Sequence, residues 1–118
     1  MLIRIDPQSD APIFDQIAAS VRADLATGRV APGDRLPGAR EVAEALGVNL
    51  HTVLRAYQEL RDEGLVDMRR GRGATVTDAA SPLAELHRDV VALVDRARRL
   101  GLSPDTLASL VKESADGR

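Results

Sequence analysis

The sequence predicts a mainly α-helical fold with a small β-hairpin, arranged as a winged helix-turn-helix that is followed by a C-terminal helical arm. Three observations predict it. Apolar residues recur at helical spacing along most of the chain, Gly47 separates two short helical patterns, and an arginine-rich glycine turn follows the second pattern at residues 69–73. Two short helices crossing at a steep angle need apolar anchors and a glycine at the bend. We expect a winged domain over residues 1–78 and a two-helix arm over residues 79–118.

Length and composition restrict the class of protein. A chain of 118 residues, 44% hydrophobic and 29% charged, can bury one modest core plus an appendage, and it resembles neither a disordered nor a membrane protein. Residues 1–10 carry acids and a proline, unlike an export signal, and cysteine is absent, so a cytoplasmic location is expected. The net charge of −2 is unlike that of a generally basic nucleic-acid binder, so positive charge must be concentrated locally.

The N-terminal half predicts three elements before the bend. Residues 2–5 form a short apolar run, read as an edge strand or a docked arm. A first helix is expected to start at Asp10 and Pro12 and to end at Gly28. After a turn and an extended step at residues 32–37, a second helix is expected over residues 39–46.

The bend and the helix after it are specified by their residue types. Gly47 can adopt the left-handed conformation that ends a helix, and Asn49 is a candidate N-cap for a third helix over residues 50–63. The helical period turns one side of that helix inward, with Val53, Tyr57 and Leu60, and leaves His51, Arg55, Gln58 and Asp62 outward. Residues 65–69 and 74–77 then read as two short strands of a hairpin.

The C-terminal arm carries a heptad seam, which is an apolar stripe that other residues must cover. The seam consists of Leu83, Leu86, Val90, Leu93, Ala97 and Leu100. Ser81-Pro82 opens a helix, and Ser103-Pro104-Asp105 opens a last one. The seam could pack on the chain's own winged domain or on a second copy, and the second copy is favoured because a monomer of this size has few surfaces to cover the seam. The expected dimerisation residues are Leu83, Leu86, Val90, Leu93, Ala97, Leu100, Leu107 and Leu110.

Several motifs recur in a fixed order from about Pro12 to Val76. They are the Leu36-Pro37 step, Arg40-Glu41, Leu46-Gly47-Val48, Thr52-Val53, Glu63-Gly64-Leu65 and the Gly-Arg-Gly turn. On these residues the chain resembles the DNA-binding half of the GntR family of bacterial transcription regulators. The run Arg55-Ala56-Tyr57-Gln58-Glu59-Leu60 and the short two-helix tail are similar to its YtrA-like subgroup, which lacks a large effector domain.

The resemblance implies DNA contacts at the start of both helices of the motif. It assigns such a contact to Arg40, which could instead pair with Glu44 on a solvated face. Asn49, His51, Thr52 and Arg55 fall in the first turns of the presumed recognition helix, which enters the major groove in proteins of this kind. Asn49 could act as a cap, a phosphate contact or both, and His51 could be an ordinary exposed histidine. The chain departs from many relatives at Leu50 and Leu54, which could meet a thymine methyl or border the core.

The resemblance also implies a wing that enters the minor groove. Arg69, Arg70 and Arg72 lie on or beside a tight turn whose glycines, Gly71 and Gly73, leave little bulk. The alternative is a solvated charged turn, in which one arginine would do no more than screen Asp67.

Other function classes fit the residues less well. The two histidines stand alone, and no nucleophile beside a base, metal-ligand cluster or nucleotide loop is visible, so we expect no enzyme, no cofactor and no metal. The prediction is a homodimeric, sequence-specific DNA-binding transcription regulator, a repressor on a palindromic operator. The alternative is a winged helix that binds protein and not DNA. The sequence does not identify a small-molecule effector. Its expected site would be the junction between the C-terminal arm and the winged domain.

Overall fold

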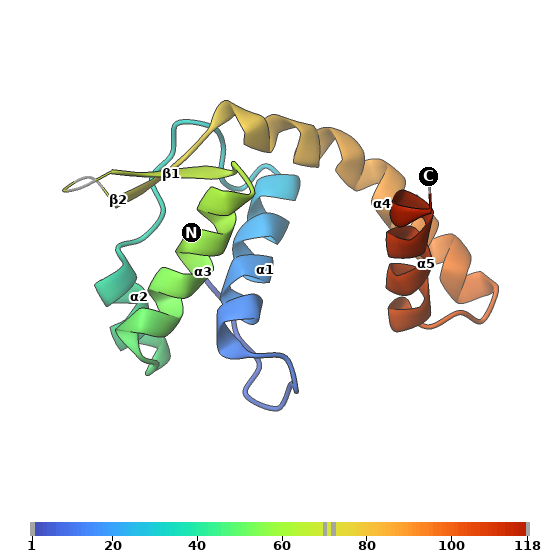
Figure 1. Cartoon of the computed structure of the whole chain (residues 1–118), viewed down its shortest axis with the longest axis horizontal. Coiled ribbons are helices and arrows are strands. Elements are labelled where there is room, and N and C mark those ends of the chain that lie inside the picture. Colours follow the sequence, from blue (N-terminus) through green and yellow to red (C-terminus); the bar gives the residue numbers. More distant parts are fainter. Residues whose placement is uncertain (1, 70, 72, 118) are drawn as a thin grey trace. The chain divides into compact units, whose positions relative to one another are not determined.

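The computed structural model describes residues 2–69, 71 and 73–117. In these residues it contains five α-helices, one short 3-10 helix and one β-hairpin, so the prediction of a mainly helical fold with a hairpin is confirmed (Figure 1). The elements in chain order are α1 (Ile13–Ala26), α2 (Ala39–Leu46), α3 (Leu50–Asp62), β1 (Val66–Arg69), β2 (Gly73–Val76), η1 (Asp78–Ala80), α4 (Ser81–Arg99) and α5 (Pro104–Asp116). The predicted bounds of α2 are those observed, and α3 ends one residue earlier than expected.

The chain forms two compact units, residues 1–85 and residues 86–118. Helix α4 contributes residues to both units. The domain boundary expected after residue 78 therefore stays a prediction.

The core of the first unit lies mainly between α1 and α3, which run side by side (Figure 1). Ile17 and Val21 of α1 and Val53 and Leu60 of α3 are its largest fully buried side chains. Burying an aliphatic side chain of this size contributes about 1.5 to 3 kcal/mol relative to leaving it in water. Apolar spacing along the two helices thus places α3 on α1 and determines which side of α3 remains outside.

The turn between α2 and α3 has the backbone that its residues predict. Gly47 ends α2 in the left-handed region, with φ of 69°, and the N–H of Val48 donates to the carbonyl of Ala43 at 3.0 Å. The side chain of Asn49 then accepts a hydrogen bond from the N–H of His51 at 2.8 Å, which caps α3. The predicted glycine bend and asparagine cap are confirmed.

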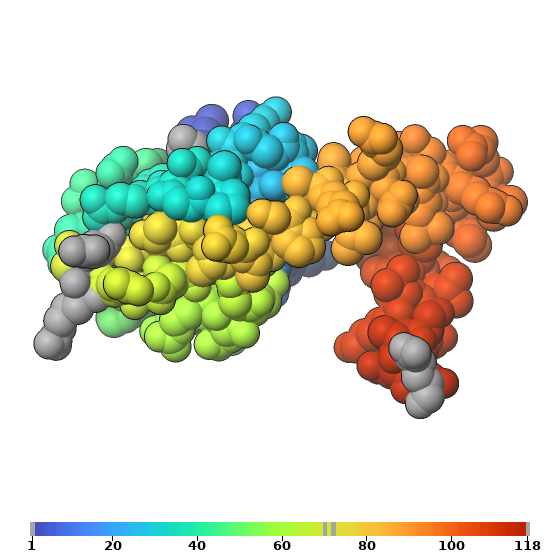
Figure 2. Space-filling model, turned by 90° about the horizontal axis from the view of Figure 1, so that it is seen from above, coloured from blue at the N-terminus to red at the C-terminus, as the bar shows by residue number. Residues whose placement is uncertain are grey.

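The wing is an antiparallel hairpin whose second strand is also paired on its outer edge. Val66 faces Val76 and Arg69 faces Gly73 in the β1–β2 register. On the other side, the N–H of Leu36 donates to the carbonyl of Ala74 at 2.9 Å, and the N–H of Val76 to that of Asp34 at 2.8 Å. Figure 2 shows this segment, in cyan, lying beside the yellow hairpin. An extended step was expected here from the sequence, but its pairing with β2 was not, and this pairing attaches the base of the wing to the core.

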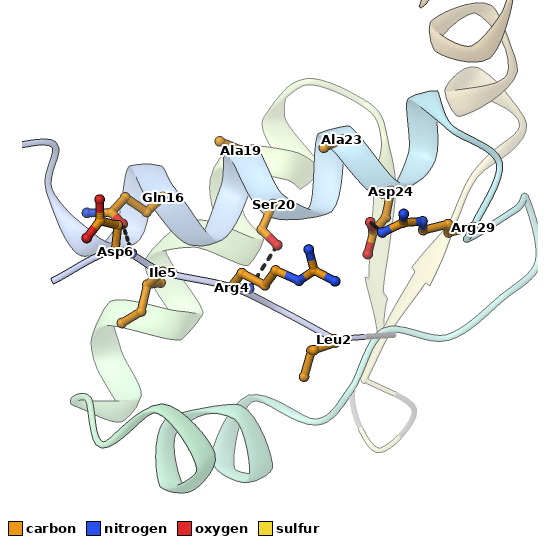
Figure 3. A pocket seen from close by; sticks show the side chains of 10 residues that line it. All are labelled: Leu2, Arg4, Ile5, Asp6, Gln16, Ala19, Ser20, Ala23, Asp24 and Arg29. Carbon is orange, nitrogen blue, oxygen red and sulfur yellow. Dashed lines mark hydrogen bonds and ion pairs between the residues drawn. The ribbon is translucent and has the colours of Figure 1, made fainter. Parts of the chain in front are cut away.

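The N-terminal segment is a docked arm and not an edge strand. Residues 2–6 have no regular secondary structure, yet Ile3 is buried in the core. The N–H of Arg4 donates to Ser20 Oγ at 3.0 Å and the N–H of Asp6 to Gln16 Oε1 at 2.6 Å, both on α1 (Figure 3). Side chains of α1 therefore replace the strand partner that the arm lacks.

The second unit is a helical hairpin of α4 and α5. Ser103 caps α5 through the N–H of Thr106 at 3.1 Å, and the N–H of Leu102 donates to the carbonyl of Ala97 at 2.9 Å, which closes α4. Ala97 is buried within this unit, whereas much of the seam is not. Among the expected dimerisation residues, the large side chains that remain exposed are Leu86, Val90, Leu93 and Leu100 of the seam and Leu110 of α5.

The left-handed turn at Gly47 generates a first prediction. The Gly47→Ala variant should unfold with a free energy about 1 to 2 kcal/mol lower, because alanine is strained at φ of 69° although its Cβ would meet no neighbouring atom. The matched control is Gly38→Ala, whose site is equally open but has φ of −59°. Gly38 is the N-cap of α2, where alanine is less favourable than glycine, but alanine also lowers the entropy of the unfolded chain. Because these effects oppose each other, that variant should change stability by less than about 0.5 kcal/mol. Urea unfolding followed by circular dichroism measures both, and equal losses would contradict the assignment of strain to Gly47.

Candidate nucleic-acid interface

Helix α3 has one buried and one exposed side, as its sequence predicts. Val53, Ala56, Tyr57 and Leu60 are buried against the first unit. The four residues expected on the opposite side, His51, Arg55, Gln58 and Asp62, are all exposed. Leu50 packs against the core and Leu54 is partly buried, so neither is a fully exposed residue. The polar side of α3 is therefore open to a partner.

Candidate residues cluster at the N-terminal end of α3. Asn49 and His51 are exposed, and Thr52 is partly exposed, with its N–H donating to the carbonyl of Asn49 at 3.0 Å. Asn49 acts as the cap, which was one of its two expected roles. A helix N-terminus carries partial positive charge and free N–H groups, which attract an anion such as a phosphate.

Arg40 lies in the first turn of α2 and is exposed. In the described part of the chain no ion pair joins it to Glu44, so the structure does not place it in the pair that was the alternative. Its charge is therefore not neutralised by that neighbour.

Arg55 is exposed, and its guanidinium group contacts an aromatic ring. Its Cζ lies 3.7 Å from the centroid of the Phe14 ring, which belongs to the first turn of α1. A cation over an aromatic face at this distance is attracted by the ring quadrupole. Arg55 was expected on the outer side of α3. Its contact with Phe14 was not predicted, because the two residues lie far apart along the chain.

Arg22 and Glu63 are a second long-range pair that sequence reasoning missed. Arg22 Nε donates to Glu63 Oε1 at 2.9 Å, and its second nitrogen reaches the other carboxylate oxygen. The hydrogen bond to Glu63 raises the pKa of the Arg22 guanidinium, against the burial that lowers it. The pair joins α1 to the C-terminal end of α3.

The wing is described in part. Arg69 is exposed and pairs with Asp67, with 3.0 Å between Arg69 Nε and Asp67 Oδ2, which is the screening role expected for one of the three arginines. Gly71 and Gly73 have φ of 80° and 70°. Arg70 and Arg72 lie outside the described residues. The positive φ values match the tight glycine turn that the sequence predicts.

Tyr57 connects the two helices of the motif. Its ring is buried and its O–H donates to the carbonyl of Pro37 at 2.6 Å, in the segment that leads into α2. Burial raises the pKa of the Tyr57 phenol, and the negative charge of Glu41 raises it further. The expected core role, with a polar partner for the hydroxyl, is confirmed.

Three helices, a capped glycine turn and a two-stranded wing define the first unit as a winged helix-turn-helix. The family model described as "Bacterial regulatory proteins, gntR family" matches residues 13–76. The chain belongs to the GntR family of bacterial transcription regulators, and it is a regulator rather than an enzyme.

Individual relatives extend the likeness beyond the winged unit. The chain is 35% identical to the HTH-type transcriptional repressor YtrA of Bacillus subtilis (strain 168), over 98% of this chain and 94% of that protein. Among solved structures it is similar to YtrA from Sulfolobus acidocaldarius, a GntR-family transcription factor, with 37% identity, a TM-score of 0.60, and coverage of 86% of this chain and 99% of that one. The AraR DNA-binding domain in complex with operator ORX1 is 25% identical, with a TM-score of 0.56 over 63% of this chain and 92% of that one. The YtrA-like resemblance is thereby confirmed.

The structure also contains no candidate membrane span: none of the helices in the described residues has both the length and the apolar character to cross a bilayer.

The buried tyrosine generates a second prediction. The Tyr57→Phe variant should lose about 1 kcal/mol of unfolding free energy near neutral pH, because the Pro37 carbonyl loses its donor. The loss should shrink above about pH 10, the ordinary pKa of tyrosine. There the unfolded wild type ionises while the folded protein, with its raised pKa, does not, so the wild type alone loses this stability as the pH rises. Denaturant unfolding at several pH values measures the difference, and a difference independent of pH would contradict the raised pKa.

Proposed function

We propose that this regulator is a repressor that binds a palindromic operator as a homodimer, with α3 in the major groove and the wing in the minor groove. One observation carries the proposal: α3 is held by its apolar side, while its polar side, with His51 and Arg55, is open. A helix of about 10 Å diameter with exposed polar side chains fits the major groove of B-form DNA. Transcription regulation on chromosomal DNA also implies a cytoplasmic location.

The charges along α3 support this orientation. A helix is stabilised by acids in its first turn and by bases in its last, because of the macrodipole. Helix α3 has no acid in its first turn, and its last turn carries one base, Arg61. The acids Glu59, Asp62 and Glu63 lie at the same end and outnumber that base. This pattern does not favour the isolated helix. It does favour an approach in which the N-terminal half faces a polyanion and the acidic end points away from it.

The residue roles follow from the exposed positions. Arg40, in the first turn of α2, contacts a phosphate or a guanine edge, and Asn49 and Thr52 contact the backbone while Asn49 also caps α3. His51 and Arg55 face the base edges, where an arginine reads guanine and a histidine can donate or accept. The side chains that specify the sequence thus lie within one and a half turns of α3.

The wing supplies the second contact. In the sequence Arg69, Arg70 and Arg72 alternate with Gly71 and Gly73, whose lack of a side chain leaves room for close approach to the duplex. Arginine in a narrow minor groove responds to the enhanced negative potential there. Because the ion pair of Arg69 with Asp67 is exposed, a phosphate can replace it at little energetic cost.

A second copy of the chain is proposed to cover the seam of the second unit. Val90 and Leu100 are 52% and 68% exposed, and Leu86, Leu93 and Leu110 are exposed as well, so this unit leaves many large apolar side chains uncovered. An apolar groove between α4 and α5 is lined by Val90, Leu93 and the partly buried Leu107. Leu83 packs on the first-unit core and Ala97 is buried in its own unit, so these two contribute less to a dimer.

The operator and the sign of regulation are proposed from the relatives. A similar protein is named a repressor, and a similar domain is solved in complex with an operator. Selection of bound sites from random duplex DNA tests the proposal directly. A palindromic consensus, with half-sites one or more helical turns apart, is expected from a dimer. Enrichment of no sequence, with binding of low salt dependence, would refute the DNA-reading function, because phosphate neutralisation makes DNA binding steeply salt dependent.

The proposed groove position of Arg40 generates a third prediction. The Arg40→Ala variant should bind the selected operator about 1 to 3 kcal/mol more weakly, with the dimer intact. The control is Arg99→Ala, which removes another exposed arginine, at the end of α4 in the second unit. Gel shift and size-exclusion chromatography measure affinity and mass. Unchanged operator affinity for Arg40→Ala would remove this residue from the interface.

The exposed seam generates a fourth prediction. The Leu93→Asp variant should dissociate the dimer at micromolar concentration and lower operator affinity, because it buries a carboxylate in an apolar contact. The Ala92→Asp control introduces the same charge at an exposed position outside the heptad seam, and it should leave the dimer intact. Light scattering gives the mass of each variant. A Leu93→Asp protein that remains dimeric would place the dimer contact elsewhere.

A further inference from the structure

We propose that Phe14 is a positioning residue for DNA reading: its ring holds the Arg55 guanidinium in place before DNA binds. The inference rests on the proposed function, in which Arg55 faces the operator. It concerns a residue that lies on α1, outside the helix-turn-helix pair.

Packing against the core holds Phe14, whereas Arg55 is exposed. Phe14 is partly buried and packs against the core of the first unit, so its ring is anchored on one side. The other side is available to Arg55, whose Cζ lies 3.7 Å from the ring centroid. Arg55 itself is exposed and belongs to the outer side of α3.

The kind of contact matters for what Arg55 can still do. In the described part of the chain no carboxylate forms an ion pair with Arg55, and no hydrogen bond uses its nitrogens. A carboxylate partner would neutralise the charge and occupy the donors. An aromatic ring attracts the cation through its face and leaves the five N–H donors for a base edge or a phosphate.

Holding a long side chain in advance lowers the cost of binding. A free arginine has about 2 kcal/mol of rotamer entropy to lose when it is fixed. If the ring has already restricted Arg55, less of that cost falls on the DNA complex, and the guanidinium is presented at one place on the recognition helix. Phe14 would then strengthen operator binding without touching DNA.

The composition of the chain allows a direct test, because Phe14 is its single phenylalanine. Growth on pentafluorophenylalanine replaces this ring alone with one of similar shape whose quadrupole no longer attracts a cation. The full-length fluorinated protein should bind the selected operator about two to five times more weakly, the change expected for an exposed cation–π contact. The Phe14→Tyr variant keeps an electron-rich ring and should match the wild type.

A second background separates positioning from folding. In an Arg55→Gln protein, which has no cation for the ring, fluorination of Phe14 should change operator affinity no further. An equal loss in both backgrounds would show that the ring acts through the fold, and unchanged affinity of the fluorinated wild type would show that it does nothing for DNA binding. Either result overturns the inference. If the unmodified protein enriches no operator, the proposed function fails instead, so the two failures are distinguishable.

Discussion

The packing of α3 on α1 is the contact on which the rest of this structure depends. A 13-residue helix is marginally stable alone in water, so α3 exists because Val53 and Leu60 are buried against Ile17 and Val21. The same packing decides which side of α3 faces outward. If α3 rotated about its axis, apolar residues would be exposed and His51 and Arg55 would be buried, both at a cost in free energy. The core therefore also determines the orientation of the proposed reading surface.

Contacts from outside the helix then restrict α3 along its length. Gly47 and Asn49 set its start, the Tyr57 hydroxyl holds its middle to the Pro37 carbonyl, and Arg22 of α1 pairs with Glu63 at its end. Each contact is modest by itself, and the Arg22 pair is half exposed. Together they leave α3 few alternative positions, and a rigid element loses less entropy when it binds. The position of the wing is restricted in the same way, because the segment before α2 pairs with β2 at the base of the wing.

The sequence was informative where the physical cause was local. Helical spacing predicted α1, α2 and α3, and the special conformations of Gly47 and Asn49 depend on their own side chains or the lack of one. Contacts between distant residues were not predictable in this way: nothing in the pattern around Arg55 or Glu63 points to a partner on α1. The segment before α2 was too short to show strand periodicity, so its pairing with β2 was missed. Leu83 and Ala97 fit the heptad seam by spacing, but local packing uses both.

A net charge of −2 does not oppose a DNA-reading role, because a duplex responds to charge close to it. At physiological ionic strength the Debye length is about 8 Å, so acids on distant surfaces are largely screened. In the described residues four acids of the first unit form ion pairs with arginines, and the acids of α3 lie toward its C-terminal end. The four are Asp24, Asp62, Glu63 and Asp67. Arg40 and Arg55 remain exposed without an ion pair in the described residues. Arg40 lies in the first turn of α2, where the helix dipole adds to its positive charge, and Arg55 lies in the first half of α3. The potential at this surface is therefore set by which charges the fold leaves unpaired, and whole-chain composition is a poor guide to it.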